Sequence, residues 1–403
     1  MQTTHPSTST SGPSDRQPEG RGPLAGLKVV EFAGLGPAPF AAMMLADHGA
    51  EVVRIARPGP PGPGQTVDLL ARGRAHLGLD LKQPEAIAVA RRLVAGAQVL
   101  IEGFRPGVME RLGLGPDACL ADNPRLVYGR ATGWGQSGPL ALTAGHDINY
   151  IALSGALHCI GPTGGPPTPV PGFIGDFGGG GMLLAFGILA ALQTAQRTGR
   201  GQVVDAAVSD GAALLTTLNH GWRHIGEWTD EAGTNLGDGG AHFFNTYRCS
   251  DGRFISVGSI EPPFYRELLQ RLGIDDPAFR AQWDRAGWPQ LKQRLAAIFA
   301  TRTRDEWCAL LEGSDACFAP VLSLTEAPAH PHNVARGTFG VAGGITQPAP
   351  APRFSGTSSP PVRALGQEGA DTRAVLQAAG FDEATIERLL ASGAAWARPV
   401  PPR

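Results

Sequence analysis

The stretch from residue 27 to residue 55, LKVVEFAGLGPAPFAAMMLADHGAEVVRI, decides the fold of this 403-residue chain. It opens with a short β-rich run at residues 27–32 and closes with a second one at 51–55. Between them, residues 40–48 have helical spacing and end at Gly49, a residue type common just past a helix end. A strand, a helix and a second strand in this order form a βαβ unit, which predicts parallel strands in an α/β fold.

The same alternation extends the predicted sheet. A helical pattern over residues 84–95 leads into a strand at 98–102, and residues 126–130 have the pattern of a further strand. Residues 131–181 hold too many Gly and Pro for regular elements, so we expect a long functional loop system there. A helix, a strand and a helix follow at 182–196, 202–208 and 210–226. We therefore expect residues 23–225 to form a large, Rossmann-like α/β domain with an open parallel sheet.

The rest of the chain has a different pattern. Two strands and three helices are predicted in order at 243–248, 253–258, 263–272, 288–300 and 304–313. They indicate a smaller α+β domain over residues 226–330. Residues 331–403 include a Pro-rich stretch and a helical pattern at 371–391, so we expect a return segment whose last helix packs on the large domain. The first 22 residues are rich in Ser, Thr, Pro and Gly, which predicts a disordered tail over residues 1–22.

Composition argues against several kinds of protein. The formal net charge of −2 gives no electrostatic basis for a nucleic-acid partner. The five cysteines are scattered without a CxxC pair, which argues against a disulfide scaffold or a zinc ribbon and favours a reducing cytoplasm. The most apolar run, residues 182–192, is shorter than the ~20 residues that cross a bilayer. We therefore expect a cytoplasmic protein without a nucleic-acid or membrane partner.

Arginines follow two of the predicted strands. Arg57 comes after the strand at 51–55, and Arg105 and Arg111 follow the strand at 98–102. Open α/β sheets bind ligands at the carboxyl ends of their strands, and guanidinium groups match phosphate oxygens. An NAD site requires an acid at the place of Arg57, so a phosphorylated nucleotide other than NAD fits better. Spacing alone leaves open that these arginines are ordinary surface charges.

Two polar clusters are candidates for acid–base chemistry. His146 and Asp147 open an apolar helical pattern, although a His-Asp pair is common by chance. Asp176 lies just before four glycines at residues 178–181. Four glycines allow close approach of a ligand and, at a helix start, offer free N–H groups, so we prefer a catalytic role for Asp176 over a helix cap with a hinge. Glu261 ends a predicted strand of the second domain, where the start of a helix is by itself the simpler interpretation.

Seven specific strings occur in order along the chain. They are LAGLKVVE at 24–31, LADHGAEVVR at 45–54, EGFRPG at 102–107, TGWGQSGP at 132–139, AGHDINY at 144–150, GDFGGG at 175–180 and GQVVDA at 201–206. With them the chain resembles the CaiB/BaiF family, the family III CoA-transferases, from about residue 23 to about residue 355. Within that family it is most similar to the α-methylacyl-CoA racemase branch.

The resemblance implies a role for each matched position. His146 and Asp176 match the two bases of the racemase branch, and Glu261 matches a glutamate that supports the histidine across the two chains of a dimer. The positions that match coenzyme A contacts are Arg57, Leu79, Asp80, Leu81, Lys82, Gly103, Phe104, Arg105 and Arg111. The positions that match the lining of the acyl thioester are Gly145, Asp147, Ile148, Asn149 and Tyr150.

The resemblance also implies an activity and an assembly. Members form interlocked homodimers of large and small domains, and the racemase branch epimerises 2-methylacyl-CoA through an enolate, whose oxygen we expect the N–H groups of residues 178–181 to hold. No metal or separate cofactor is required, because coenzyme A is part of the substrate. The alternative is CoA transfer between carboxylic acids through an anhydride at the position of Asp176. Transferases generally lack a histidine at position 146, so His146 together with Glu261 favours the isomerase, while the acyl group stays open.

Overall fold

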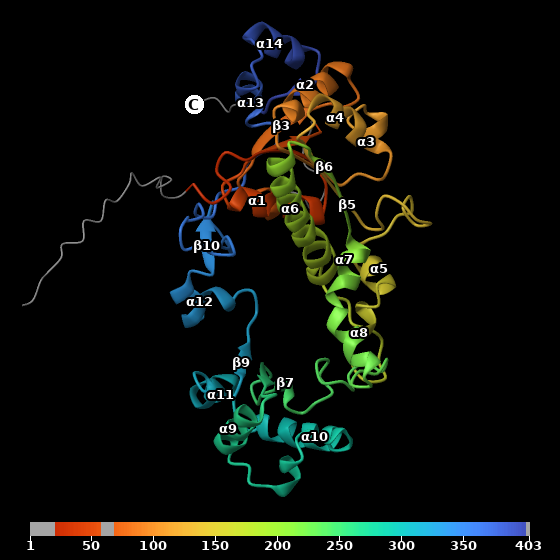
Figure 1. Cartoon of the computed structure of the whole chain (residues 1–403). Coiled ribbons are helices and arrows are strands. Elements are labelled where there is room, and N and C mark those ends of the chain that lie inside the picture. Colours follow the sequence, from red (N-terminus) through yellow and green to blue (C-terminus); the bar gives the residue numbers. More distant parts are fainter. Residues whose placement is uncertain (1–20, 58–67, 400–403) are drawn as a thin grey trace, which may run out of the picture.

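The computed structural model describes residues 21–57 and 68–399, so the predicted tail over residues 1–22 lies almost wholly outside the described residues. A seven-stranded sheet in the order β12-β3-β2-β1-β4-β5-β6 forms the large lobe at the top of Figure 1. All neighbouring strands are parallel except β12 and β3. The strands are β1 (Lys28–Phe32), β2 (Glu51–Ala56), β3 (Ala75–Leu79), β4 (Val99–Glu102), β5 (Val127–Thr132), β6 (Gln202–Ala207) and β12 (Ala395–Trp396). The predicted open α/β sheet is confirmed, with an antiparallel edge strand added.

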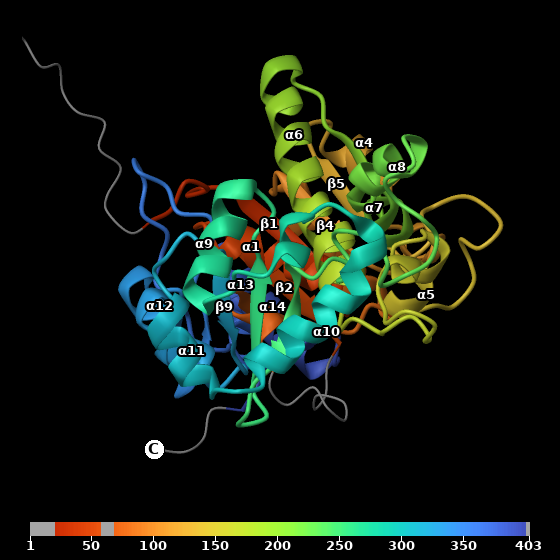
Figure 2. The same cartoon turned by 90° about the horizontal axis from the view of Figure 1, so that it is seen from below.

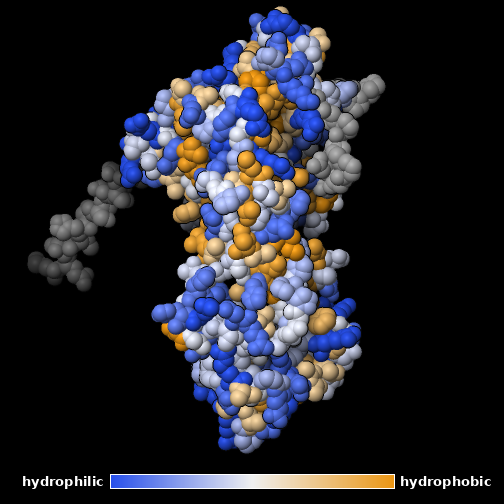
Figure 3. Space-filling model, turned by 90° about the vertical axis from the view of Figure 1, so that its right-hand side faces the viewer, coloured by the Kyte–Doolittle hydropathy of each residue, from blue (hydrophilic) through white to orange (hydrophobic). Residues whose placement is uncertain are grey.

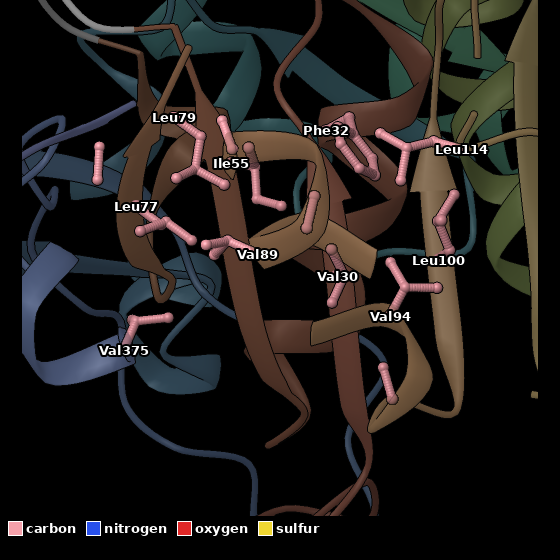
Figure 4. Packing of buried hydrophobic residues seen from close by; sticks show 14 of the residues in the cluster. Val30, Phe32, Ile55, Leu77, Leu79, Val89, Val94, Leu100, Leu114 and Val375 are labelled. Carbon is pink, nitrogen blue, oxygen red and sulfur yellow. The ribbon is translucent and has the colours of Figure 1, made fainter. Parts of the chain in front are cut away.

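Helices cover both faces of this sheet, because successive residues of a strand point to opposite sides. Val30 of β1 belongs to a core that also contains residues of the helices on one face, α2 (Pro84–Ala95), α4 (Pro116–Asp122), α13 (Thr372–Ala378) and α14 (Glu383–Ala391). Figure 4 shows this core, in which Val30, Val89 and Val375 come from the sheet, α2 and α13. Val29, the preceding residue, packs on the other face under α1 (Pro37–Asp47) and α6 (Leu183–Thr198). The two cores hold the strand ends, and the loops that follow them, at one edge of the sheet.

Strand β3 is not predicted by the sequence, since it contains His76 and Gly78 and no β-branched residue. Its neighbours explain the glycine. A Cβ atom at Gly78 would stand 2.6 Å from the carbonyl oxygen of Trp396, so glycine allows β12 to pair with β3. The strand is thus set by contacts with a segment at the other end of the chain.

Charged side chains are buried across the first three strands. Glu31 lies opposite Arg54, and Arg54 lies opposite His76, in the register of β1, β2 and β3. Burial raises the pKa of Glu31, against the effect of Arg74, whose Nη1 lies 2.8 Å from Glu31 Oε2. Arg54 Nη1 also donates to Glu368 Oε1 at 3.1 Å. This ionic cluster therefore ties the C-terminal part of the chain to the centre of the large lobe.

The segment at 131–181 is not a continuous loop, contrary to our expectation. It contains α5 (Asp147–Leu153) and a π-helical segment, η3 (Phe173–Met182), which continues directly into α6. Glycine counts against a helix in sequence reasoning, but here it is required by packing. A Cβ at Gly179 would stand 2.6 Å from the backbone nitrogen of Ala212, in α7 (Val208–Leu215), and one at Gly180 would stand 2.7 Å from Pro37 Cβ in α1. The glycines thus let two helices approach η3 closely.

The expectation that residues 178–181 start a helix and hold an enolate oxygen is wrong. The helix begins at Phe173, five residues earlier, so these glycines lie inside it. In a π-helix each N–H points to the carbonyl five residues earlier, as the Phe177 N–H does to the Gly172 carbonyl at 2.9 Å. The N–H groups of residues 178–181, which lie inside the same helix, therefore face the preceding turn. Asp176 instead occupies the first turn of η3.

Substituting Gly211 by alanine is expected to lower the free energy of unfolding by ~1–3 kcal/mol. A Cβ there would stand 1.8 Å from the carbonyl oxygen of Gly179, so α7 and η3 would have to move apart. The urea midpoint measures the loss. Gly221→Ala in α8 (Thr217–His224) is the matched control, because nothing lies within 4 Å of a Cβ at Gly221, and a gain of up to about 1 kcal/mol is expected from helix propensity. Equal midpoints for the two variants would contradict the packing role.

Segments η3 and α6 together form an apolar helical stretch of 26 residues, Phe173–Thr198. By length and composition alone this stretch could cross a bilayer. The apolar run at 182–192, which the sequence analysis judged too short, is only part of this longer helix. Leu184 and Ile188 of α6 nevertheless pack in the core with Val127 of β5. The stretch therefore behaves as a core helix of the large lobe, with its outer side exposed.

The small lobe lies at the other end of the molecule from the large sheet (Figure 1). In Figure 2, which views the molecule from below, the helices of the small lobe lie in front of the large lobe. Its antiparallel sheet has the order β7-β8-β9. The elements are β7 (Phe244–Arg248), β8 (Phe254–Gly258), α9 (Pro262–Leu272), α10 (Trp288–Phe299), α11 (Arg304–Leu311) and β9 (Phe318–Val321). The predicted strand pair and three helices are confirmed. Strand β9 was not predicted, because Pro320 weakens its pattern.

The chain then returns to the large lobe. α12 (Pro331–Arg336) and a hairpin of β10 (Phe339–Ala342) and β11 (Ile345–Pro348) precede an irregular stretch that leads to α13. The helix predicted at 371–391 is divided into α13 and α14 at Gly380, which has a φ of 80°. The helix predicted at 210–226 is likewise divided into α7 and α8. The remaining short helices are η1 (Leu69–Ala71), α3 (Val108–Arg111), η2 (Leu157–Cys159), η4 (Pro277–Arg280), η5 (Arg285–Gly287) and η6 (Ala327–Ala329).

Candidate active site

The loops after the parallel strands β1 to β5 gather at one edge of the large sheet, because parallel strands end on the same side. Arg57 follows β2, while Arg105 and Arg111 follow β4, and all three side chains are exposed. The structure thus brings the three predicted phosphate ligands to the same edge of the sheet. A polyanionic ligand laid across this edge would meet a row of guanidinium groups.

The turn that presents Gly103, Phe104 and Arg105 is organised by a carboxylate that sequence reasoning missed. Glu102 Oε2 accepts the N–H of Phe104 at 2.7 Å, and Glu102 Oε1 accepts Arg130 Nε at 2.7 Å. Burial raises the pKa of Glu102, against these two hydrogen bonds. A buried carboxylate beside an arginine on the next strand would have been the signal. Glu102 therefore fixes the turn, and Arg105 is the side chain that the turn exposes.

Residues 79–82 differ in how they can reach a ligand. The side chain of Leu79 is buried in the core, and Leu81 packs against the same core. Asp80 Oδ1 accepts the N–H of Lys82 at 3.2 Å, so this carboxylate holds the turn before α2. Lys82 itself is exposed. Any ligand contact by the buried Leu79 therefore has to come from backbone atoms, whereas the partly buried Leu81 and the exposed Lys82 can use their side chains.

Asp176 is a half-buried carboxylate at the junction of three helices. It lies in the first turn of η3, and a Cβ at Gly36, the residue before α1, would stand 2.7 Å from its Oδ2. Gly36 has a φ of 68°, a left-handed value that favours glycine. Burial and the charge of Asp147 raise the pKa of Asp176 to about 6, while His146 acts in the opposite direction. The carboxylate is thus a stronger base than an exposed aspartate and sits beside a backbone that leaves room for a ligand.

His146 precedes α5 directly and is exposed. Its backbone N–H donates to Asn149 Oδ1 at 3.0 Å, so Asn149 caps the start of α5 and does not point freely into the site. Ile148 is exposed on the same turn. The histidine lies close enough to Asp176 to lower the pKa of that carboxyl. The structure therefore brings together the two side chains that the sequence marked as bases.

Tyr150 supports the loop before α5. Its hydroxyl donates to the carbonyl oxygen of Gly145, and its ring packs edge-on against Trp134 with centroids 4.8 Å apart. A Cβ at Gly133 would stand 1.9 Å from this ring, so glycine is required there. Burial raises the pKa of Tyr150, the charge of Asp176 adds to the rise, and Arg105 opposes it. Tyr150 therefore lies within electrostatic reach of both Arg105 and Asp176.

Asp147 connects the two segments that hold the bases. Its Oδ1 accepts the backbone N–H of Asp176 at 2.7 Å. The side chain is half-buried between α5 and η3. The sequence marked Asp147 as part of a His-Asp pair and of the acyl lining. It did not reveal this contact, because sequence patterns do not show a hydrogen bond between a side chain and a backbone group 29 residues away.

Glu261 lies in the other lobe. It is the exposed residue that precedes α9, and its charge adds to the effect of burial in raising the pKa of Cys317. Among the described residues of a single chain, no hydrogen bond or ion pair joins Glu261 to His146 or Asp176. One chain therefore assembles two of the three predicted catalytic side chains and leaves the third in the small lobe, at the start of α9 (Figure 1).

A separate cavity of about 290 Å³ lies beyond the C-terminal end of α5. His158, Cys159, His220 and Trp228 are among its lining residues, and none of the three predicted catalytic residues is. His146 is exposed and Asp176 is half-buried, so both side chains of the candidate site lie outside this cavity and can be reached from solvent. Within residues 21–57 and 68–399, no group of three or more His, Cys, Asp or Glu side chains could hold a metal ion.

The fold and the site define an α/β enzyme for acid–base chemistry, with a histidine and a carboxylate of raised pKa beside an arginine-bearing strand edge. The family model for CoA-transferase family III matches residues 24–372. The α-methylacyl-CoA racemases of Mus musculus and Homo sapiens are 45% and 44% identical, each over 91% of this chain and 96% of the relative. The crystal structure of a CaiB/BaiF family protein from Brucella suis superimposes with a TM-score of 0.78 at 26% identity, covering 89% of this chain and 100% of that one. The chain belongs to CoA-transferase family III, as the sequence motifs predicted.

Proposed function

We propose that this chain is an isomerase that epimerises the 2-methyl centre of branched acyl-CoA thioesters. The observation that supports this most directly is the pair of bases, His146 before α5 and Asp176 in η3, with the pKa of Asp176 raised to about 6. Epimerisation needs one base on each face of the reacting carbon, and general bases work best with a pKa near the working pH. The level of identity to the two mammalian racemases supports the same reaction.

The proposed reaction is a proton transfer through an enolate. The thioester carbonyl acidifies the α-proton, one base removes it, and the conjugate acid of the other base returns a proton to the opposite face. The enolate oxygen requires N–H donors. In the first turn of α5, the Asn149 N–H already donates to the carbonyl oxygen of His146 at 2.8 Å. The N–H groups of Asp147 and Ile148 open the same helix without a partner inside it and lie next to His146, so we assign this role to them in place of residues 178–181.

Coenzyme A is proposed to lie along the strand edge, as part of the substrate. Its phosphates would meet Arg57, Arg105, Arg111 and Lys82, so binding energy remote from the reaction would orient the acyl group. No separate cofactor takes part in this scheme. The acyl group itself could be a steroid side chain, a branched fatty acid or an arylpropionyl group, which places the reaction in lipid metabolism.

Replacing Arg57 or Arg111 by alanine is expected to raise KM for the acyl-CoA by about 10–100-fold, the loss of one charge-assisted contact of ~1.5–3 kcal/mol. The kcat should change less, because the arginines are remote from the reacting carbon. Steady-state kinetics with one epimer measure both constants. Arg200→Ala is the matched control, since this exposed arginine precedes β6 and therefore stands at the opposite edge of the sheet. An unchanged KM in both Arg57→Ala and Arg111→Ala would show that these arginines do not bind the acyl-CoA and are ordinary surface charges.

One incubation separates the proposed reaction from CoA transfer. A single 2-methylacyl-CoA epimer is incubated in heavy water, with and without a free carboxylic acid. α-Deuteration with epimerisation that needs no acceptor supports the isomerase. Thioester formation that requires the acceptor, together with a hydroxamate on Asp176 after hydroxylamine trapping, would instead assign a transferase that works through an aspartyl-CoA anhydride.

We further propose a homodimer in which Glu261 of one chain completes the site of the other. Support comes from apolar side chains that one chain leaves exposed near the site, on α7 and α8 and just beyond, among them Leu214, Leu215, Leu218 and Ile225. Figure 3 shows apolar side chains gathered around the narrow middle of the molecule, between the lobes. We place the enzyme in the cytoplasm, because all five cysteines are free thiols.

A further inference from the structure

The hydrogen bond between Asp147 and Asp176 joins the two segments that hold the proposed bases. Asp147 is the first residue of α5 and follows His146 directly, while Asp176 lies in the first turn of η3. The N–H groups at a helix start have no partner within the helix. Asp147 Oδ1 supplies one for the Asp176 N–H at 2.7 Å. The main chain of one base is therefore fixed by the residue next to the other.

Helices α5 and η3 are closely packed around the hydrogen bond between Asp147 and Asp176. Gly175 is buried, and a Cβ there would stand 2.1 Å from Asp147 Oδ1 and 2.8 Å from Ile151 Cγ2. Only glycine therefore allows α5 and η3 to come this close. Since Ile151 is fully buried on the same face of α5, the carboxylate of Asp147 has a defined position against η3.

The charge of Asp147 also acts on Asp176. Two titratable neighbours at the start of α5, Asp147 and the preceding His146, affect the carboxyl group of Asp176, and Tyr150 of α5 lies nearby. The facing end of α1 carries no ionisable side chain, and the acid on α7, Asp210, is exposed. Burial is the largest cause of the raised pKa of Asp176, the like charge of Asp147 adds to it, and His146 opposes both.

We propose that Asp147 is a positioning residue for the epimerisation, which holds the main chain of Asp176 beside His146 and by its negative charge strengthens Asp176 as a base. This inference rests on the proposed function, because it assigns a use to the proton affinity of Asp176. A carboxylate that binds protons more tightly removes the α-proton more readily, as long as the working pH keeps it ionised.

Asp147→Asn tests the inference, because the amide oxygen still accepts the Asp176 N–H while the charge is gone. Deuterium incorporation is measured for each epimer as a function of pH. The Asp176→Ala variant identifies the epimer whose α-proton Asp176 removes, because exchange of that epimer is lost in it. For that epimer, the acidic limb of kcat/KM is expected to move to lower pH by about half a unit or more. Its maximal rate should fall several-fold, because the base is weaker. Asp147→Ala, which also loses the acceptor, should fall further in kcat.

Asp382→Asn is the matched control. Asp382 also lies at a helix start and accepts a backbone N–H, that of Thr385 at 2.7 Å, but far along the chain at α14. Its pH profile should equal that of the wild type. A wild-type profile in a folded Asp147→Asn protein would overturn the inference and leave the racemase intact. Failure of the proposed function would show differently, as wild-type protein that exchanges no α-proton without an acceptor.

Discussion

Asp176→Ala is expected to lower the rate of epimerisation by ~10²–10⁴-fold, and His146→Ala by a similar factor, because each removes one general base. Each variant should still exchange the α-proton of one epimer with heavy water. The surviving base serves one face of the reacting carbon, so the two variants should retain exchange from opposite epimers. Chiral analysis of the acyl group, together with deuterium content, measures both quantities on the same sample.

The matched control is Asp210→Ala, which removes an exposed acid from α7. It should keep the wild-type rate, and all three variants should keep the wild-type unfolding midpoint. Full epimerisation in either base variant, or exchange of the same epimer in both, would contradict the assignment of two bases on opposite faces.

Two inactive chains are expected to restore activity when they are refolded together. Asp176→Ala and Glu261→Ala lie in different lobes, and no contact of one described chain joins these residues. If each site combines the large lobe of one chain with the small lobe of its partner, a heterodimer has one intact site. Random pairing of equal amounts should then recover about a quarter of the wild-type activity.

Mixing His146→Ala with Asp176→Ala is the decisive control. Both residues belong to one lobe of one chain and lie near each other, so no heterodimer of these variants contains a complete site. This mixture should stay inactive while the first one recovers. Sedimentation gives the assembly state of each mixture. An active monomer, or inactive heterodimers of Asp176→Ala with Glu261→Ala, would contradict a site shared between two chains. Glu261 would then have only a structural role at the start of α9.

The elements that sequence reasoning found are those whose pattern is local. The run of apolar residues in β1 and β2 and the helical period of α2 depend on one face of one element, so spacing is enough. Strand β3 and segment η3 depend on partners elsewhere. Gly78 is explained by Trp396, and Gly179 by Ala212, and neither partner can be recognised from the segment itself. In both cases the glycine counted against a strand or helix when the sequence was considered alone. In the structure the same glycine is what allows the strand or helix to pack against its partner.

The same distinction applies to the site. His146, Asp176 and the arginines at the strand ends could be marked from the sequence, because their residue types and their places after predicted elements are informative. The roles of Glu102 and Asp147 could not. Each accepts a backbone N–H, that of Phe104 and that of Asp176, and these two contacts leave no trace in spacing or composition. For Glu102, the only available signal was its arginine partner on the next strand, Arg130. Because η3 already begins at Phe173, residues 178–181 lie inside the helix and cannot donate to an enolate oxygen. The proposed N–H donors are therefore those at the start of the neighbouring helix α5.

The pairing of β12 with β3 has a consequence for the way the chain is made. Strand β3 emerges early in synthesis, whereas its edge partner lies about 300 residues further along. At ~5–20 residues per second, this edge waits about 15–60 s with its backbone groups unpaired. An uncovered sheet edge is a template for pairing with other chains. During this interval the outer edge of β3 is open to pairing with other chains, and the interval ends only when β12 has been synthesised. The yield of the protein in the cell should therefore depend on chaperones that cover that edge.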